Sequence, residues 1–158
     1  MKRIIFLVVL CIILASFSFG LSVQGFGGPQ LKITTFGTST EMAFLLGGGG
    51  GVILNDHFVI GGAGFTTLNK KPFEFNYGVA HLGYMFDLDP LALELGANFG
   101  GGTGGIFIVE PELSLSFKFV SWMELNVNAG YRFGIKEGID KSVSGFSGGL
   151  FVAFGNFF

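Results

Sequence analysis

Acidic side chains dominate the few residues that could carry chemistry in this chain. Five glutamates and two basic residues lie in segments of alternating polarity: Glu74, Glu94, Glu110, Glu112, Glu124, Lys118 and Arg132. Clustered carboxylates can line a proton or cation path or act as an acid pair, and with basic partners they form enclosed ion pairs. We interpret the set as ion pairs that fill a closed structure, with the path and the acid pair as alternatives.

Two other patterns with chemical potential are weaker. Gly100–Gly105 matches the GxGxxG spacing of a dinucleotide loop, but Ile106–Val109 and then Pro111 follow it where the motif requires a helix. His57 and His81 stand isolated, without a Ser, His and Asp set or metal-ligand spacing around them. The sequence therefore predicts no catalytic residue, no metal site and no cofactor, and a flexible loop at residues 100–105.

The elements that must position these residues are β-strands. From Met123 to Ile135 apolar residues at odd positions alternate without exception with polar residues or glycine, and Leu113–Phe119 and Leu91–Phe99 repeat the pattern. A period of two indicates a strand with one apolar and one polar face. The pattern extends to eight predicted strands, at residues 30–36, 41–54, 57–68, 73–87, 91–99, 106–120, 122–135 and 145–158.

The connections between these strands alternate in length. Tight turns are predicted at 55–56, at 88–90 and around Ser121, and longer loops at 37–40, 69–72, 100–105 and 136–144. In an antiparallel series successive connections lie at opposite ends, so the tight turns share one rim and the loops the other. The prediction is an all-β fold, an eight-stranded antiparallel up-and-down barrel. Strands of about 13 residues, tilted by about 40–45°, span roughly 30 Å, close to the apolar band of an outer-membrane barrel.

The direction of the apolar face separates two kinds of barrel. A soluble barrel with an apolar interior shows the same alternation, but its exterior normally carries far more than the 13% charged residues found here. Small residues interleaved with a few ionisable ones suit the crowded lumen of an eight-stranded barrel. We therefore expect the apolar faces to contact lipid and the polar faces to line the lumen.

One strand register supports this polar lumen. A turn about Ser121 that sets Phe119 opposite Met123 gives two oppositely charged pairs. These pairs are Lys118 with Glu124 and Glu110 with Arg132. Enclosed charges need such partners, because an unpaired charge in a poorly hydrated interior costs several kcal/mol.

Glycine-rich segments flank the first predicted tight turn. Gly47–Gly51 face Gly61, Gly62 and Gly64 across Asn55-Asp56. We interpret them as relief of crowding where a small barrel bends and as room for large side chains from the opposite wall. The alternative is a patch for close packing of another molecule.

The start of the chain predicts export. Residues 1–20 combine a basic start at Lys2 and Arg3, an apolar run of 12 and small residues suited to cleavage after Ser18 or Gly20, which is the pattern of a signal peptide. Residues 21–158 are then one barrel domain. Without Lys2 and Arg3 the chain keeps seven basic against eleven acidic residues, which argues against nucleic acid as a partner.

The last predicted strand ends in an aromatic residue. Counting back by two from Phe158 gives Asn156, Phe154, Val152 and Leu150. This alternation resembles the carboxy-terminal insertion signal of bacterial outer-membrane barrels, with Asn156 as the departure, and it implies recognition by the barrel-assembly machinery. With the signal peptide and eight strands, the chain resembles small outer-membrane proteins of the OmpA-domain and OmpX kind. Trp122, beside the turn at Ser121, and Tyr84 suit anchors at the membrane interface.

The function expected from this resemblance is a structural or surface-interaction role in the outer membrane, with outer-membrane lipid as a partner and a filled lumen that does not conduct. The surface partner is left open. The alternatives are a secreted or periplasmic soluble barrel that binds an apolar ligand and, as a third reading, a membrane-embedded enzyme.

Overall fold

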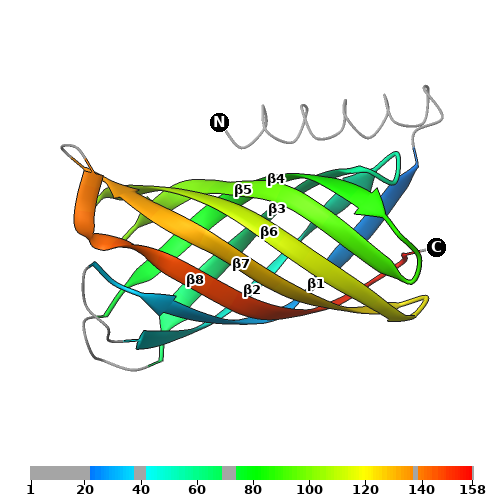
Figure 1. The fold of residues 1–158 in the computed structure, drawn as a ribbon, viewed down its shortest axis with the longest axis horizontal. Helices are drawn as coiled ribbons and strands as arrows, with labels where there is room; N and C mark the ends of the chain where they lie inside the picture. Colours follow the sequence, from blue (N-terminus) through cyan, green and yellow to red (C-terminus); the bar gives the residue numbers. More distant parts are fainter. Residues whose placement is uncertain (1–21, 38–41, 69–73, 137–138, 158) are drawn as a thin grey trace, which may run out of the picture.

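The computed structural model describes residues 22–37, 42–68, 74–136 and 139–157, so the predicted signal peptide at 1–20 and Phe158 lie outside it. It contains eight strands: β1 (Val23–Thr35), β2 (Met42–Leu54), β3 (Phe58–Thr67), β4 (Asn76–Asp87), β5 (Leu91–Gly102), β6 (Ile106–Val120), β7 (Met123–Ile135) and β8 (Ile139–Gly155). They form a closed antiparallel barrel in sequence order (Figure 1). The predicted fold class is confirmed. Within these residues no helix has the length and apolar character needed to cross a bilayer.

The barrel has two different rims. The turns after β2, β4 and β6 lie at the rim where β1 begins and β8 ends, which we call the short-turn rim (Figure 1). Asn55 and Asp56 both have positive φ, 51° and 62°, as in the primed turns that match the twist of a hairpin. The opposite rim, where β1, β3, β5 and β7 end, is called the long-loop rim.

The first strand is longer than its sequence pattern predicts. β1 starts at Val23, and the segment before Gln30 pairs with β2, with Gly27 opposite Gly50 and Gly28 opposite Gly49. Glycine and proline have low strand propensity and hide the alternation, so the sequence pattern misses these residues. Here two glycine-rich strands pair with each other, and backbone hydrogen bonds rather than side-chain contacts hold them together.

Two predicted loops are partly strand. β5 continues to Gly102, and the turn that follows uses Gly104 and Gly105, whose φ values are +83° and +74°. The predicted loop at 136–144 is wrong over most of its length, because β8 begins at Ile139 and pairs with Ile135. The β7–β8 hairpin therefore extends further than the alternation of apolar residues predicts.

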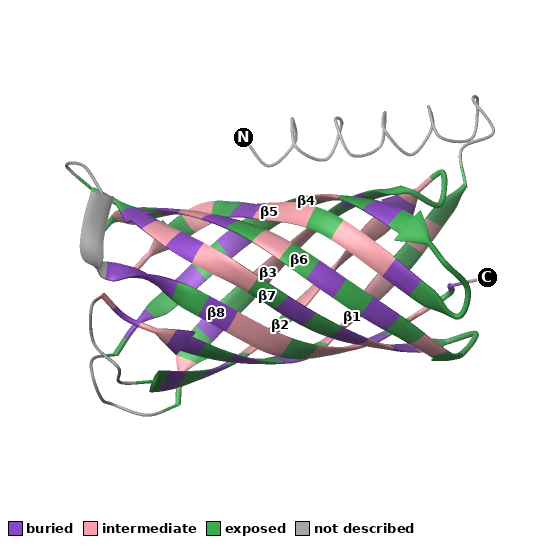
Figure 2. Cartoon of the chain, viewed as in Figure 1, coloured by how far each residue is buried: buried purple, intermediate pink, exposed green. Residues whose placement is uncertain are grey.

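Inward and outward faces alternate along the strands as predicted (Figure 2). In β7, Glu124, Asn126, Asn128 and Arg132 are buried in the lumen, whereas Val127 is exposed on the outer wall. The outer wall carries most of the large exposed apolar side chains, among them Leu46, Ile60, Leu82, Leu95, Leu113, Leu115 and Leu150. An apolar outer wall around a polar lumen is the arrangement of a barrel that stands in lipid.

The lumen is layered along the barrel axis. Near the long-loop rim an apolar cluster contains Phe36, Ala43, Leu45, Phe65, Phe75, Tyr77, Val79, Ile108 and Val143. Near the short-turn rim a second cluster contains Ile53, Val59, Met85, Ala92, Ala153 and Phe157. Between them lies a layer of charged and polar side chains, which we call the polar layer. The fold thus places ionisable groups in the middle of the lumen, shielded from lipid.

Candidate functional site in the barrel lumen

An ion pair from opposite walls forms the centre of the polar layer. Lys32 on β1 and Glu110 on β6 are both fully buried, and Lys32 Nζ lies 2.8 Å from Glu110 Oε1. The same ammonium is 3.4 Å from Glu112 Oε2, and Ser147 on β8 donates its hydroxyl to Glu110. One cation therefore serves two carboxylates, and the contacts join strands that are far apart in the sheet.

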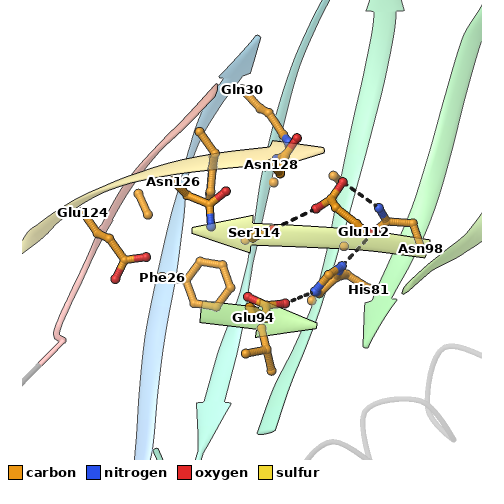
Figure 3. A pocket seen from close by; sticks show the side chains of 18 of the residues that line it. Phe26, Gln30, His81, Glu94, Asn98, Glu112, Ser114, Glu124, Asn126 and Asn128 are labelled. Atoms are coloured by element: carbon orange, nitrogen blue, oxygen red, sulfur yellow. Dashed lines mark hydrogen bonds and ion pairs between the residues drawn. The ribbon is translucent and has the colours of Figure 1, made fainter. Parts of the chain in front are cut away.

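The network continues from Glu112 toward β4. Asn98 donates from Nδ2 to Glu112 Oε2 at 3.3 Å, which fixes its amide orientation and turns Oδ1 toward His81 (Figure 3). His81 Nδ1 is 2.8 Å from Asn98 Oδ1, and His81 Nε2 is 2.5 Å from Glu94 Oε1. Both ring nitrogens thus face oxygen atoms, an arrangement that an imidazolium satisfies because it donates from both nitrogens.

Two glycines make room for the pair of His81 and Glu94. Gly83 on β4 and Gly96 on β5 lie opposite each other in the ladder. A Cβ atom built on Gly96 would lie 2.6 Å from His81 Cε1, and one built on Gly83 would collide with the Glu94 carboxylate. The absence of side chains at these two positions therefore leaves the space that the His81–Glu94 pair occupies.

Arg132 belongs to the apolar cluster at the long-loop rim. Its guanidinium carbon is 4.6 Å from the ring centre of Phe36, 5.5 Å from that of Phe75 and 5.6 Å from that of Tyr77. Its Nε donates to the Val143 carbonyl at 2.9 Å. A buried cation surrounded by ring faces is stabilised by the ring quadrupoles, and here it packs with the rings in the lumen beneath the long-loop rim.

The predicted register between β6 and β7 is present, but its side-chain partners differ. Lys118 lies opposite Glu124, whereas Met123 pairs with Val120 rather than Phe119, because the register shifts beyond Lys118. Lys118 Nζ forms an ion pair with Asp87 Oδ1 at 3.2 Å. The partner of Glu110 is Lys32 rather than Arg132. The prediction from sequence considered charge pairs between adjacent strands only, whereas side chains from opposite walls meet in the lumen.

The remaining predicted acids divide between lumen and rim. Glu94, Glu112 and Glu124 line the lumen. Glu74 does not: it is exposed and precedes β4, so its placement in the lumen is wrong. The segment at 74–75 is not strand, and the alternation that placed Glu74 inside does not apply there.

Sequence reasoning missed Lys32 and misjudged His81. Lys32 follows Gln30 and precedes Thr34 on the polar face of a predicted strand, so the alternation contained the necessary signal. His81 is not isolated, but the inner face of β4 around it consists of Val79, Gly83 and Met85, none of which is polar. No alternation of polar residues marks that face, and only the closed barrel brings His81 to Glu94.

A cavity of about 90 Å³ lies beside the polar layer, toward the short-turn rim (Figure 3). One wall is polar and includes His81, Glu94, Asn98, Glu112, Ser114, Glu124, Asn126 and Asn128. The other is apolar and includes Phe26, Ile53, Val59, Met85, Phe151 and Phe157. The lining is completed by Gln30, Phe65 and Ala153 and by small residues of β2 and β3, namely Gly49, Gly50, Gly61, Gly62 and Ala63. Because these small residues have little or no side chain, they leave space between themselves and the opposite wall.

The predicted interface residues lie at the short-turn rim. Trp122 is exposed in the β6–β7 turn and stacks on Phe154, with ring centres 6.2 Å apart and planes at 13°. Tyr84 packs edge-on against Phe58 and Phe86 on the outer wall. Of the terminal strand, Leu150 and Phe154 are exposed on the same wall. The rim thus carries an outward aromatic girdle of the kind found at membrane interfaces.

The chemistry open to His81 is limited by its contacts. Glu94 and Asn98 occupy both ring nitrogens, so neither is available to activate a hydroxyl or bind a metal ion. Among the described residues no group of three or more His, Cys, Asp and Glu side chains is placed to hold a metal ion. Gly100–Gly102 are strand residues, and β6 follows the glycine segment where a dinucleotide loop needs a helix.

The apolar outer wall, the enclosed polar layer and the two unlike rims define a small β-barrel of the transmembrane kind. The fold is similar to that of Neisserial surface protein A, with a TM-score of 0.60 and 17% identity over 88% of this chain and 99% of that one. It is also similar to Ail, the attachment invasion locus protein of Yersinia pestis, with a TM-score of 0.57 and 12% identity over 84% of this chain and 97% of that one. No family model and no curated protein matches the sequence.

Proposed function

We propose that the chain is a non-enzymatic barrel of the bacterial outer membrane that presents its long-loop rim at the cell surface for contact, and whose lumen passes no solute. The observation that carries the proposal is the cluster of Phe36, Phe75, Tyr77 and Arg132, which occupies the lumen beneath that rim. A pore needs a continuous polar path, and this cluster interrupts it. We therefore assign recognition, rather than transport of solutes, to the long-loop rim of the barrel.

The outer wall supports the membrane location over the aqueous alternative. Exposed side chains there include Leu82 at 52%, Leu95 at 54% and Phe107 at 50%. A continuous apolar wall of this kind favours transfer from water to lipid by about 25 cal/mol per Å². A secreted or periplasmic barrel would expose the same surface to water, where it promotes aggregation.

Assembly in the membrane is part of the proposal. Leu150, Val152 and Phe154 face outward on β8, and the strand pairs with β1 to close the barrel. The outward alternation suits recognition by the barrel-assembly machinery through the last strand. The resemblance in fold to a protein named as a surface protein and to one named for attachment and invasion supports a contact role for the opposite rim.

Cell fractionation and planar-bilayer recording test the proposal together. The protein should stay with outer membranes after aqueous washing, migrate differently before and after heating in detergent, and give no stepwise conductance. Release by an aqueous wash would contradict the location, and large stable conductance would contradict the closed lumen. Labelling of intact cells at a cysteine introduced at Thr103, in the β5–β6 turn, tests which rim faces outward.

A further inference from the structure

The cavity beside the polar layer has unlike walls. Glu94, Glu112 and Glu124 place three carboxylates on one side, and the lining contains no lysine or arginine. Opposite them stand aromatic rings, with Phe26 and Phe151 edge to face at 6.2 Å between centres. A site of this form presents hydrogen-bond acceptors at one end and apolar surface at the other.

The donors nearest the carboxylates of the cavity are already engaged. Lys32 is divided between Glu110 and Glu112, and the Asn98 amide donates to Glu112. The Gln30 amide also lies on the lining. Asn128, only 5% exposed, also lines the cavity, and its Oδ1 accepts no hydrogen bond from any described residue. A buried acceptor without a donor costs about 1–3 kcal/mol, so this wall favours an occupant that brings donors and positive charge.

The shape of the cavity sets the size of the occupant. A water-sized group needs about 10–15 Å³ of cavity volume. The cavity of about 90 Å³ therefore has room for a chain of about six such groups. The space exists because Gly61 and Ala63 on β3 have little or no side chain to extend into the lumen. The long-loop end of the lumen is filled by the cluster around Arg132, so an occupant would enter from the short-turn rim, past the second apolar cluster.

We propose that this cavity binds a small organic ammonium ion, with its charged head among Glu94, Glu112, Glu124 and Asn128 and its short apolar body against Phe26, Phe151 and Met85. The acid wall supplies acceptors for the N–H groups, and the ring faces stabilise the cation and its alkyl chain. The mixed walls favour an organic cation over a metal ion, which prefers an all-polar shell. The surface role and the cavity use opposite ends of the barrel, so either can fail without the other.

The test is a titration of the full barrel, refolded in an uncharged maltoside detergent, with n-butylammonium chloride, followed by amide NMR. We expect saturable shifts at residues of the cavity lining such as Gly61 and Asn128. Sodium chloride at equal ionic strength, n-butanol and propionate serve as matched controls and should leave these signals in place. Equal saturation by n-butanol, or no saturation by n-butylammonium, would overturn the proposal.

Three variants locate the site. Glu124→Gln should weaken binding about tenfold, because a charged acceptor becomes a neutral one of the same shape. Glu74→Gln, which removes an exposed carboxylate outside the lumen, should leave binding unchanged. Ala63→Leu fills the cavity without changing a charge and should abolish binding, and it keeps the test decisive if Glu124→Gln does not fold. Wild-type affinity in both cavity variants would place the site elsewhere and refute the proposal.

Discussion

His81 on β4 and Glu94 on β5 meet diagonally across the inner wall, with Nε2 2.5 Å from Oε1, although the ladder partner of His81 is Asn98. The diagonal is open because Gly83 and Gly96 lie side by side between the two residues. Two glycines on neighbouring strands thus decide whether an ion pair forms in the lumen. The arrangement makes the polar layer sensitive to the addition of one methyl group.

Gly96→Ala should destabilise the barrel by about 1–3 kcal/mol, because the new Cβ would lie 2.6 Å from His81 Cε1 and separate the ring from Glu94. Urea unfolding in lipid vesicles, followed by Trp122 fluorescence, measures the change. Gly64→Ala is the matched control, since a Cβ built there has no atom within 4 Å and faces the outer wall. Equal stability of the two variants would show that the pair contributes nothing.

Lys32→Met should cost about 3–5 kcal/mol, because it leaves Glu110 and Glu112 as buried carboxylates without their shared ammonium. Adding Glu110→Gln to the same chain should recover part of the loss. Lys118→Met is the comparison at the rim: its partner Asp87 is 46% exposed, and such a pair contributes less than about 1 kcal/mol. The same unfolding measurement ranks the three variants, and a larger loss for Lys118→Met would contradict the structure.

Trp122 is the single tryptophan of the chain and reports its own depth. At the short-turn rim it should be quenched more strongly by lipids brominated near the headgroup than by lipids brominated near the chain ends, because indole prefers the interface. The measurement is steady-state fluorescence in vesicles of each lipid. Stronger quenching from the bilayer centre would show that this rim lies deeper than its aromatic girdle indicates.

Opening the apolar cluster should convert the closed barrel into a channel. The double variant Arg132→Ala with Phe75→Ala removes a guanidinium and one of the rings that surround it, and stepwise currents should then appear in planar bilayers. Phe146→Ala, which removes an outward side chain 71% exposed near the same rim, should remain silent. Continued silence of the double variant would mean that the polar layer and the second apolar cluster block the lumen without the Arg132 cluster.

The sequence predicts the barrel better than it predicts the lumen. Alternation along β5, β6 and β7 identifies the outer wall and the register that sets Lys118 opposite Glu124, because both depend on neighbours in the chain or the next strand. Contacts across the lumen depend on closure. Lys32 contacts Glu110 although β1 and β6 are five strands apart along the chain, and no local sequence pattern predicts a contact between them.

Glycine accounts for the other differences. The start of β1 and the end of β5 are strand in spite of residues with low strand propensity, because pairing partners on both sides compensate. The cavity follows from the same composition: the sequence predicts that Gly61 makes room for side chains of the opposite wall, and beside Gly61 and Ala63 part of that room stays empty.

The ion pair of Lys32 and Glu110 also bears on how the barrel folds. In an open sheet β1 and β6 are far apart, and only curling brings the ammonium to the carboxylate. Ser147 on β8, the strand that closes the barrel against β1, donates to the same carboxylate. A half-curled sheet in lipid would hold unpaired charges and an unpaired strand edge together. Closing the ring of strands and neutralising its interior are therefore a single event, and folding should be cooperative, without a stable halfway state.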